Sequence, residues 1–178
     1  MTPTVQFIQQ LQALKEGERS RLRQLAGQPL DESLPGFDLF TGLWWPLRQL
    51  NQKAPRRETS WLVAKLYGAF PIPYVPSEGT TQALACVLGR CEPSDHDRDG
   101  KRRYRQRFDA LLQSPLSNLE PHLRWALSVV ADAIAAKKCS GLDWAQLLDE
   151  LSAWHNGEEA SHVRTCEKWA SQYLDAAK

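Results

Sequence analysis

Apolar residues recur every three or four positions along most of this chain, which is the spacing of an amphipathic α-helix. The clearest stripe is formed by Leu119, Leu123, Leu127, Val130 and Ile134. No segment alternates apolar and polar residues in the way that a half-buried strand does, and the sequence contains no internal repeat. The sequence therefore predicts an all-α protein.

Prolines and polar clusters divide this helical pattern. Three prolines within residues 70–76 predict an ordered loop, because proline lacks a backbone donor and restricts the residue before it. A short helix is expected over residues 80–88. The sequence Ser117-Asn118-Leu119-Glu120 has the form of a capping box, and it predicts a helix that begins there with Pro121 in its first turn.

A chain of 178 residues can bury one sizeable core or two small ones. The acidic segment 91–100 separates the helical patterns of the two halves. We therefore expect two packed helical lobes, residues 1–90 and residues 101–178, joined by the short linker loop 91–100.

The composition is that of an ordinary globular protein, with 42% hydrophobic and 24% charged residues. No run approaches the ~18 apolar residues that span a bilayer. The N-terminus lacks the charged start and apolar core of a secretory signal, and the four cysteines are sparse and irregularly spaced. These features predict a cytoplasmic protein with reduced thiols and no membrane partner.

A cluster of positive charge stands out against this nearly neutral background. Five cations occur within seven residues, with no acid among them, whereas the whole chain has a formal net charge of +1. They are Lys101, Arg102, Arg103, Arg105 and Arg107. A local positive field in a near-neutral protein indicates a site for a polyanion.

Helical geometry separates these cations into flanks. The apolar residues of this segment are Tyr104, Phe108, Leu111 and Leu112, which share one face of a helix at about 100° per residue. Arg103 and Arg107 flank this stripe on one side, Lys101 and Arg105 flank it on the other, and Arg102 points away from the core. A solvated helix face is the simpler interpretation. Two observations favour binding instead: no Glu is interleaved among the cations, and the helix dipole disfavours cations near a helix N-terminus.

Motifs for catalysis or metal binding are absent from the sequence. It has no phosphate-binding glycine loop, no nucleophile elbow and no zinc-protease motif. Cys86, Cys91 and His96 do not form the closely paired halves of a structural zinc site. We therefore expect no catalytic residue, no metal and no cofactor.

Several short motifs occur in an order that is similar to a known family. They are Arg19 with Leu22-Arg23, Lys101-Arg102-Arg103, Arg107-Phe108 before Leu111-Leu112, His122-Leu123-Arg124, Leu142-Asp143-Trp144, Leu147-Leu148-Asp149-Glu150-Leu151 with Trp154, and Val163-Arg164 before Trp169-Ala170 and Tyr173. With these motifs the chain resembles the CasB family, the small subunit of the type I-E CRISPR Cascade complex. The resemblance covers most of the chain and is strongest in its second half.

The resemblance implies a function as well as a fold. Members of the family are all-helical, non-enzymatic proteins with two lobes, and two copies pack head-to-tail within an RNA-guided surveillance complex. The implied partners are guide RNA (crRNA), target DNA, other Cascade subunits and a second copy of the chain. The implied backbone contacts, which hold the guide–target hybrid and the displaced strand, fall on Arg19, Arg23, Arg103, Arg107, Arg124 and Arg164. Together with Lys101, Arg102 and Arg105, these are the candidate nucleic-acid-binding residues.

Two other classes of function remain open at this point. One is a helical protein–protein adaptor whose basic face binds an acidic partner instead of nucleic acid. The other is a hydrolase or deaminase with a metal site that the sequence does not reveal. The acidic loop before Lys101 has no role that the sequence alone assigns.

Overall fold

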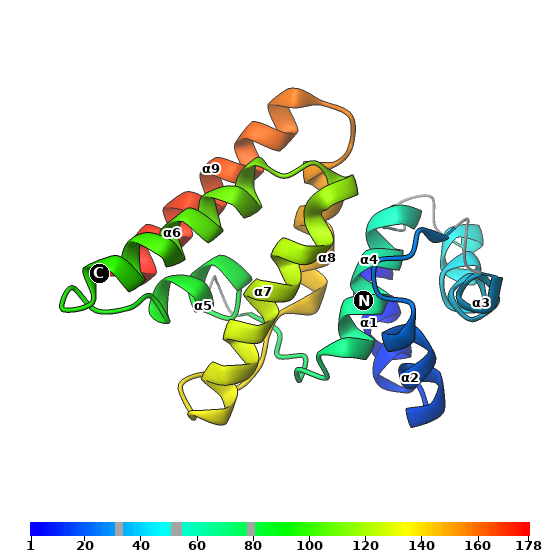
Figure 1. The fold of residues 1–178 in the computed structure, drawn as a ribbon. Coiled ribbons are helices and arrows are strands. Elements are labelled where there is room, and N and C mark those ends of the chain that lie inside the picture. The colour runs from blue at the N-terminus through cyan, green and yellow to red at the C-terminus, as the bar shows by residue number, and fades with distance from the viewer. Residues whose placement is uncertain (31–33, 51–54, 78–80) are drawn as a thin grey trace. The chain divides into compact units, whose positions relative to one another are not determined.

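The computed structural model describes residues 1–30, 34–50, 55–77 and 81–178, the side chains of residues 34–37 excepted. These residues form helices and connecting loops (Figure 1), and their only strand-like pairing is a single bridge between Tyr74 and Leu142. The helices are α1 Pro3–Gln12, α2 Glu16–Gln24, α3 Leu34–Leu50, α4 Arg57–Ala69, α5 Leu84–Arg90, α6 Arg98–Gln113, α7 Leu116–Ala135, α8 Trp144–Trp154 and α9 Glu159–Ala176. The predicted all-α class is confirmed. No helix of the described residues combines the length and the apolar character that crossing a bilayer requires.

The chain divides into two compact units. Unit 1 comprises residues 1–71 and 144–152, so that α8 joins the N-terminal helices. In its core the ring of Phe40 meets those of Phe7 and Trp61 edge-on, with centroids 6.2 and 5.6 Å apart. Helix α2 packs closely on α4 at Gly68, where an added Cβ would lie 2.8 Å from the Cβ of Leu22. Glycine is needed there because the two backbones approach so closely.

Unit 2 comprises residues 72–143 and 153–178. Its helix α5 packs against α9, and an added Cβ on Gly89 of α5 would collide with the carbonyl oxygen of Tyr173. The Tyr173 ring stacks on Phe108 of α6, with centroids 4.4 Å apart and planes 20° from parallel. These contacts fix α6 against α5 and α9.

Three local features differ from the sequence-based expectation. The units divide after residue 71 and not at the predicted linker 91–100, which lies inside unit 2 because α5 packs on α9. Helix α5 begins at Leu84, later than predicted. The predicted capping box is wrong, because α7 already begins at Leu116 after an extended Pro115 and has no side-chain cap. Pro121 consequently lies inside the helix, beyond its first turn.

Candidate nucleic-acid interface

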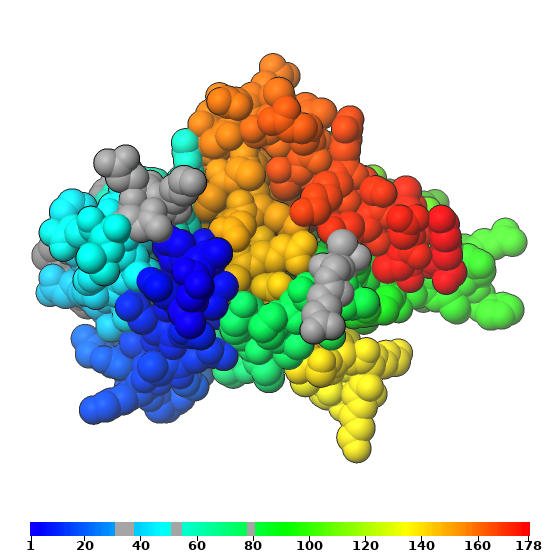
Figure 2. Space-filling view, turned by 180° about the vertical axis from the view of Figure 1, so that it is seen from behind, coloured from blue at the N-terminus to red at the C-terminus, as the bar shows by residue number. Residues whose placement is uncertain are grey.

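Helix α6 carries the basic cluster on a buried apolar stripe. The Asp97 carboxylate caps the helix by accepting a hydrogen bond from the Gly100 amide at 3.0 Å. Phe108 and Leu111 are buried, which holds the helix against the rest of unit 2. On the face shown in Figure 2, the green segment, which includes the loop before α6 and the start of that helix, extends beyond the C-terminal end of α9 (red).

The acidic loop before α6 neutralises one flank of the basic cluster. The Glu92 side chain is only 4% exposed, and its carboxylate lies 2.8 Å from Arg105 Nε and 3.2 Å from Lys101 Nζ. The hydroxyl of Tyr173 also donates a hydrogen bond to it. Lys101 also lies 2.5 Å from an oxygen of the Asp95 carboxylate. Lys101 and Arg105 are therefore paired with carboxylates, and the loop 92–100 acquires a structural role.

This pairing shifts the pKa values of the groups involved. Burial alone would raise the pKa of Glu92, but the hydrogen bonds from Arg105, Tyr173 and Lys101 outweigh burial and lower the pKa below its usual value. Burial and the hydrogen bond to Glu92 raise the pKa of Tyr173. Glu92 is thus held as a buried carboxylate by three donors.

Arg102 is paired as well, although much more weakly. One of its guanidinium nitrogens lies 3.3 Å from the Asp99 carboxylate, and both side chains are more than two-thirds exposed. The absence of Glu among the cations of α6 is therefore no sign of unbalanced charge, because Glu92, Asp95 and Asp99 supply the balance from the loop and the first turn.

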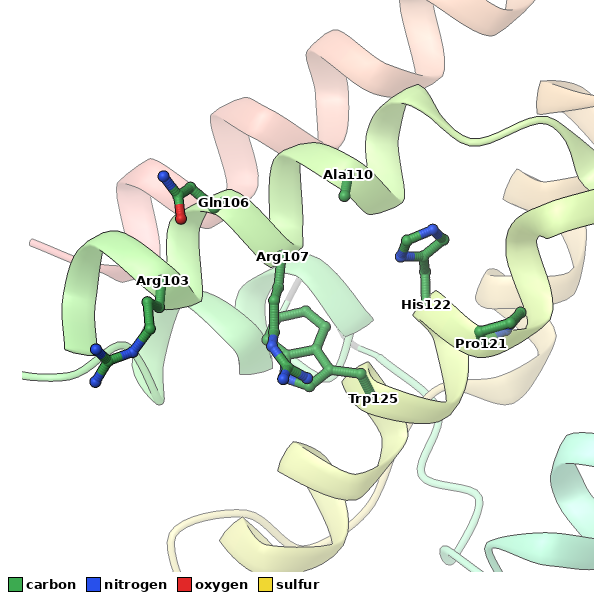
Figure 3. A pocket seen from close by; sticks show the side chains of 7 residues that line it. All are labelled: Arg103, Gln106, Arg107, Ala110, Pro121, His122 and Trp125. Carbon is green, nitrogen blue, oxygen red and sulfur yellow. The ribbon is translucent and has the colours of Figure 1, made fainter. Parts of the chain in front are cut away.

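The other flank has a different environment. Arg103 and Arg107 are exposed, and no carboxylate of the described residues pairs with either of them. Both line a hollow of about 420 Å³ between α6 and α7 (Figure 3). The other lining residues are Gln106, Ala110, Pro121, His122 and Trp125.

Trp125 supplies an aromatic ring to this hollow. Its ring is met edge-on by Tyr104, with centroids 5.3 Å apart and planes at 71°, and the Tyr104 hydroxyl donates to the Leu88 carbonyl. Arg107 extends across the indole, with Cζ 5.8 Å from the ring centroid (Figure 3). The hollow therefore combines two cations that lack carboxylate partners with an aromatic wall.

The remaining candidate residues lie elsewhere. Arg19 and Arg23 belong to α2 in unit 1, where Arg19 donates to the Gln12 carbonyl at 2.8 Å and Arg23 pairs with Glu16 at 3.0 Å. In unit 2, Arg124 on α7 lies 3.9 Å from the Glu120 carboxylate. Arg164 on α9 donates to the Ser161 hydroxyl at 3.1 Å. Of the candidate residues, only Arg103 and Arg107 line the hollow.

Comparison with known proteins identifies the family. The model of the family described as CRISPR-associated protein Cse2 matches residues 18–174. The chain belongs to the Cse2 family. The predicted resemblance to CasB is thereby confirmed. No curated protein sequence matches the chain.

Solved structures share the fold of this Cse2-family chain. The crystal structure of CasB from M. ruber has a TM-score of 0.71 at 22% identity, over 98% of this chain and 94% of that one. A Cse2-family CRISPR-associated protein from Thermus thermophilus has a TM-score of 0.66 at 23% identity, over 98% and 99% of the two chains. A structure of CasB from the same organism has a TM-score of 0.65 at 24% identity, with the same coverage.

A second cationic hollow of about 490 Å³ was not predicted from the sequence. Arg90, Lys137 and Lys138 line it together with Gln82, Ile134, Cys139 and Ser140. Lys137 has a φ of 60°, a left-handed conformation that glycine adopts more readily. Local sequence patterns could not reveal this hollow, because Lys137 and Lys138 meet Arg90 only through the packing of unit 2.

The described residues contain no group of three or more His, Cys, Asp or Glu side chains placed to hold a metal ion. The four cysteines are free thiols. The contact between the Cys166 thiol and His162 Nε2, at 3.6 Å, involves a thiol whose pKa is raised by burial. A raised pKa disfavours the thiolate that nucleophilic chemistry uses.

Proposed function

We propose that this Cse2-family chain is a non-catalytic nucleic-acid-binding subunit of an RNA-guided CRISPR surveillance (Cascade) complex. In this role it stabilises the guide RNA–target DNA hybrid and the displaced strand during antiviral defence. The observation that carries the proposal is the pair Arg103 and Arg107, two exposed guanidinium groups without a carboxylate partner among the described residues, beside an open hollow.

The proposed mechanism is electrostatic. Opening a DNA duplex while forming an RNA–DNA hybrid is a nearly balanced exchange, so modest contacts to the backbone can shift it. Arginine suits such contacts because its planar guanidinium binds two phosphate oxygens at once. Contacts of this kind position a strand without reading its bases. Base pairing with the guide RNA then supplies the sequence specificity, and this subunit supplies stability.

Other cations supply further proposed contacts within each unit. Arg124 and Arg164 belong to the same unit as Arg103 and Arg107, and Arg19 and Arg23 belong to unit 1. Lys101, Arg102 and Arg105 contribute less than the sequence suggests, because their carboxylate partners offset their charge. The other Cascade subunits and a second copy of the chain are the proposed protein partners. Several weak contacts within one assembly provide an affinity that a single patch lacks.

The test uses the assembled complex with Arg103→Ala/Arg107→Ala in this subunit. We expect a lower yield of the open R-loop and a weaker dependence of target affinity on salt. The slope of log affinity against log salt should fall by about 0.7 to 0.9 for each lost phosphate contact. Arg102→Ala/Lys178→Ala is the matched control, since it removes two cations of unit 2 that are paired with Asp99 and Asp175.

Two outcomes for Arg103→Ala/Arg107→Ala distinguish nucleic-acid binding from the adaptor function. An unchanged R-loop yield and salt slope in Arg103→Ala/Arg107→Ala would contradict nucleic-acid binding at this flank. If the variant instead fails to enter the complex, and an acidic peptide competes with the wild-type subunit for entry, the basic face binds a protein partner.

A further inference from the structure

The hollow between α6 and α7 has two kinds of wall. Arg103 and Arg107 supply positive charge, whereas Trp125, Pro121 and Ala110 supply apolar surface (Figure 3). A continuous duplex does not present the flat faces of its bases to such a surface, because those faces are stacked on one another inside the helix. An acidic peptide supplies anions but not the flat ring that an aromatic wall favours. A ligand with both an anionic group and an exposed flat ring matches both walls.

From this combination we propose that the hollow receives one unpaired nucleotide, with its base against Trp125 and its phosphate between Arg103 and Arg107. The inference rests on the proposed nucleic-acid-binding function and specifies the ligand at this site. Aromatic side chains stack on any of the bases, and guanidinium groups bind the phosphate next to them. The site therefore favours single-stranded segments, or a base displaced from a helix, without preferring a sequence.

The indole is held ready for stacking. The edge-on contact with Tyr104 at 5.3 Å fixes the ring, and the Tyr104 hydroxyl is itself anchored on the Leu88 carbonyl. The Cζ of Arg107 lies 5.8 Å from the indole centroid, near the outer limit of about 6 Å for a cation–π contact. Arg107 can therefore move from the ring to an incoming phosphate while the indole keeps its place.

The polar lining residues fit an unpaired base. Gln106 and His122 border the hollow from α6 and α7, and the described residues supply neither side chain with a hydrogen-bond partner. Their donors and acceptors are thus available to the edge of a base, which has lost its pairing partner. A volume of about 420 Å³ lies in the range of pockets that enclose a single small ligand.

The experiment compares two probes of equal charge. One is a short single-stranded thymidine oligonucleotide with a 2-aminopurine at its centre, and the other has the same phosphates with abasic sites in place of the bases. We expect the full-length protein to bind the first about tenfold more tightly, which corresponds to the usual energy of one base–aromatic stack. Binding should also quench the fluorescence of the 2-aminopurine.

Variants assign the preference to the hollow. Trp125→Leu keeps an apolar side chain but no ring, so it should lose the tenfold preference and the quenching while the salt slope stays unchanged. Trp125→Phe keeps a ring and should recover both. Arg103→Ala/Arg107→Ala should weaken binding of both probes and lower both salt slopes. Thermal denaturation followed by circular dichroism confirms that each variant is folded before its binding is compared.

The outcomes separate the two proposals. Equal affinity for both probes, or a preference that survives in Trp125→Leu, overturns the single-nucleotide site and leaves backbone binding intact. Binding of both probes that is indifferent to Arg103→Ala/Arg107→Ala overturns the proposed function at this surface. Absence of binding to either probe at low salt overturns the single-nucleotide site, whereas the proposed function is judged by the R-loop yield and salt slope of the assembled complex.

Discussion

The two flanks of α6 carry similar residues in very different surroundings. On one flank Lys101 and Arg105 converge on Glu92, a carboxylate that is 4% exposed and that also accepts a hydrogen bond from Tyr173. On the other flank Arg103 and Arg107 face an open hollow, and no described carboxylate pairs with them. The first flank holds α6 against the rest of unit 2, and the second presents charge to solvent.

This contrast shows that a run of cations in a sequence does not define a uniform positive surface. Glu92 lies 13 residues before Arg105, and it reaches that side chain only because the loop folds back along α6. A residue that is paired in the free protein must exchange its carboxylate for a phosphate on binding, whereas an unpaired residue gains the contact outright. The free energy available for binding phosphate is therefore concentrated on Arg103 and Arg107.

The largest expected effect comes from reversing the charge of the open flank. Arg103→Glu/Arg107→Glu should reduce affinity for single-stranded DNA at low salt on the order of a hundredfold, because two attractive contacts become repulsive. Titrations at several salt concentrations, followed by fluorescence anisotropy, measure the loss. Arg102→Glu/Lys178→Glu changes the net charge equally and should lose only a few-fold. Equal losses in the two variants would show that total charge matters and that the flanks do not differ.

The next largest expected effect is a loss of stability when the paired flank is changed. Glu92→Gln keeps the shape of the side chain but replaces an oxygen that accepts from cations with an amide that donates. Because the carboxylate is buried and accepts hydrogen bonds from charged groups, the free energy of unfolding should fall by about 1 to 3 kcal/mol. Urea denaturation measures the difference.

Glu92→Gln also tests the comparison of the two flanks through its binding to single-stranded DNA. With Lys101 and Arg105 released from Glu92, the salt slope for single-stranded DNA should rise by up to about 0.7 for each cation that reaches a phosphate. An unchanged slope in a folded Glu92→Gln protein would mean that this flank faces away from the nucleic acid.

Acid should remove the stabilisation that Glu92 provides. Its pKa is lowered in the folded protein from an ordinary value of 4.5, so the stabilisation is complete above that value and is lost as the pH falls through the lower, folded pKa. The difference in unfolding free energy between wild type and Glu92→Gln should therefore shrink as the pH falls below about 4.5. A difference that stays constant through this acid range would show that the hydrogen bonds to Glu92 do not depend on its charge.

Local periodicity was sufficient to predict the helical class and the apolar stripe of α6, since Phe108 and Leu111 are buried as expected. It could not predict which cations are paired, because the Glu92 contacts depend on how the preceding loop folds and on Tyr173 from α9. Local patterns also could not predict where the two units divide. The division depends on the packing of α5 against α9, and these helices are separated by most of the second half of the sequence. The start of α7 was misplaced because Ser117 and Glu120 matched a capping motif, although the helix begins at Leu116, directly after the extended N-cap Pro115.

The smallest expected effect comes from the exposed pair between Arg102 and Asp99. Both side chains are about 70% exposed or more and their atoms lie 3.3 Å apart, so Asp99→Asn should lower the free energy of unfolding by less than about 1 kcal/mol. Part of that loss reflects the position of Asp99 in the first turn of α6, where a negative charge interacts favourably with the helix dipole. Denaturation of Asp99→Asn and Glu92→Gln under the same conditions tests whether burial distinguishes the two acids. If Asp99→Asn is as destabilising as Glu92→Gln, the depth of the carboxylate does not decide how firmly α6 is held, and the proposed division between a fastening flank and a binding flank loses its physical basis.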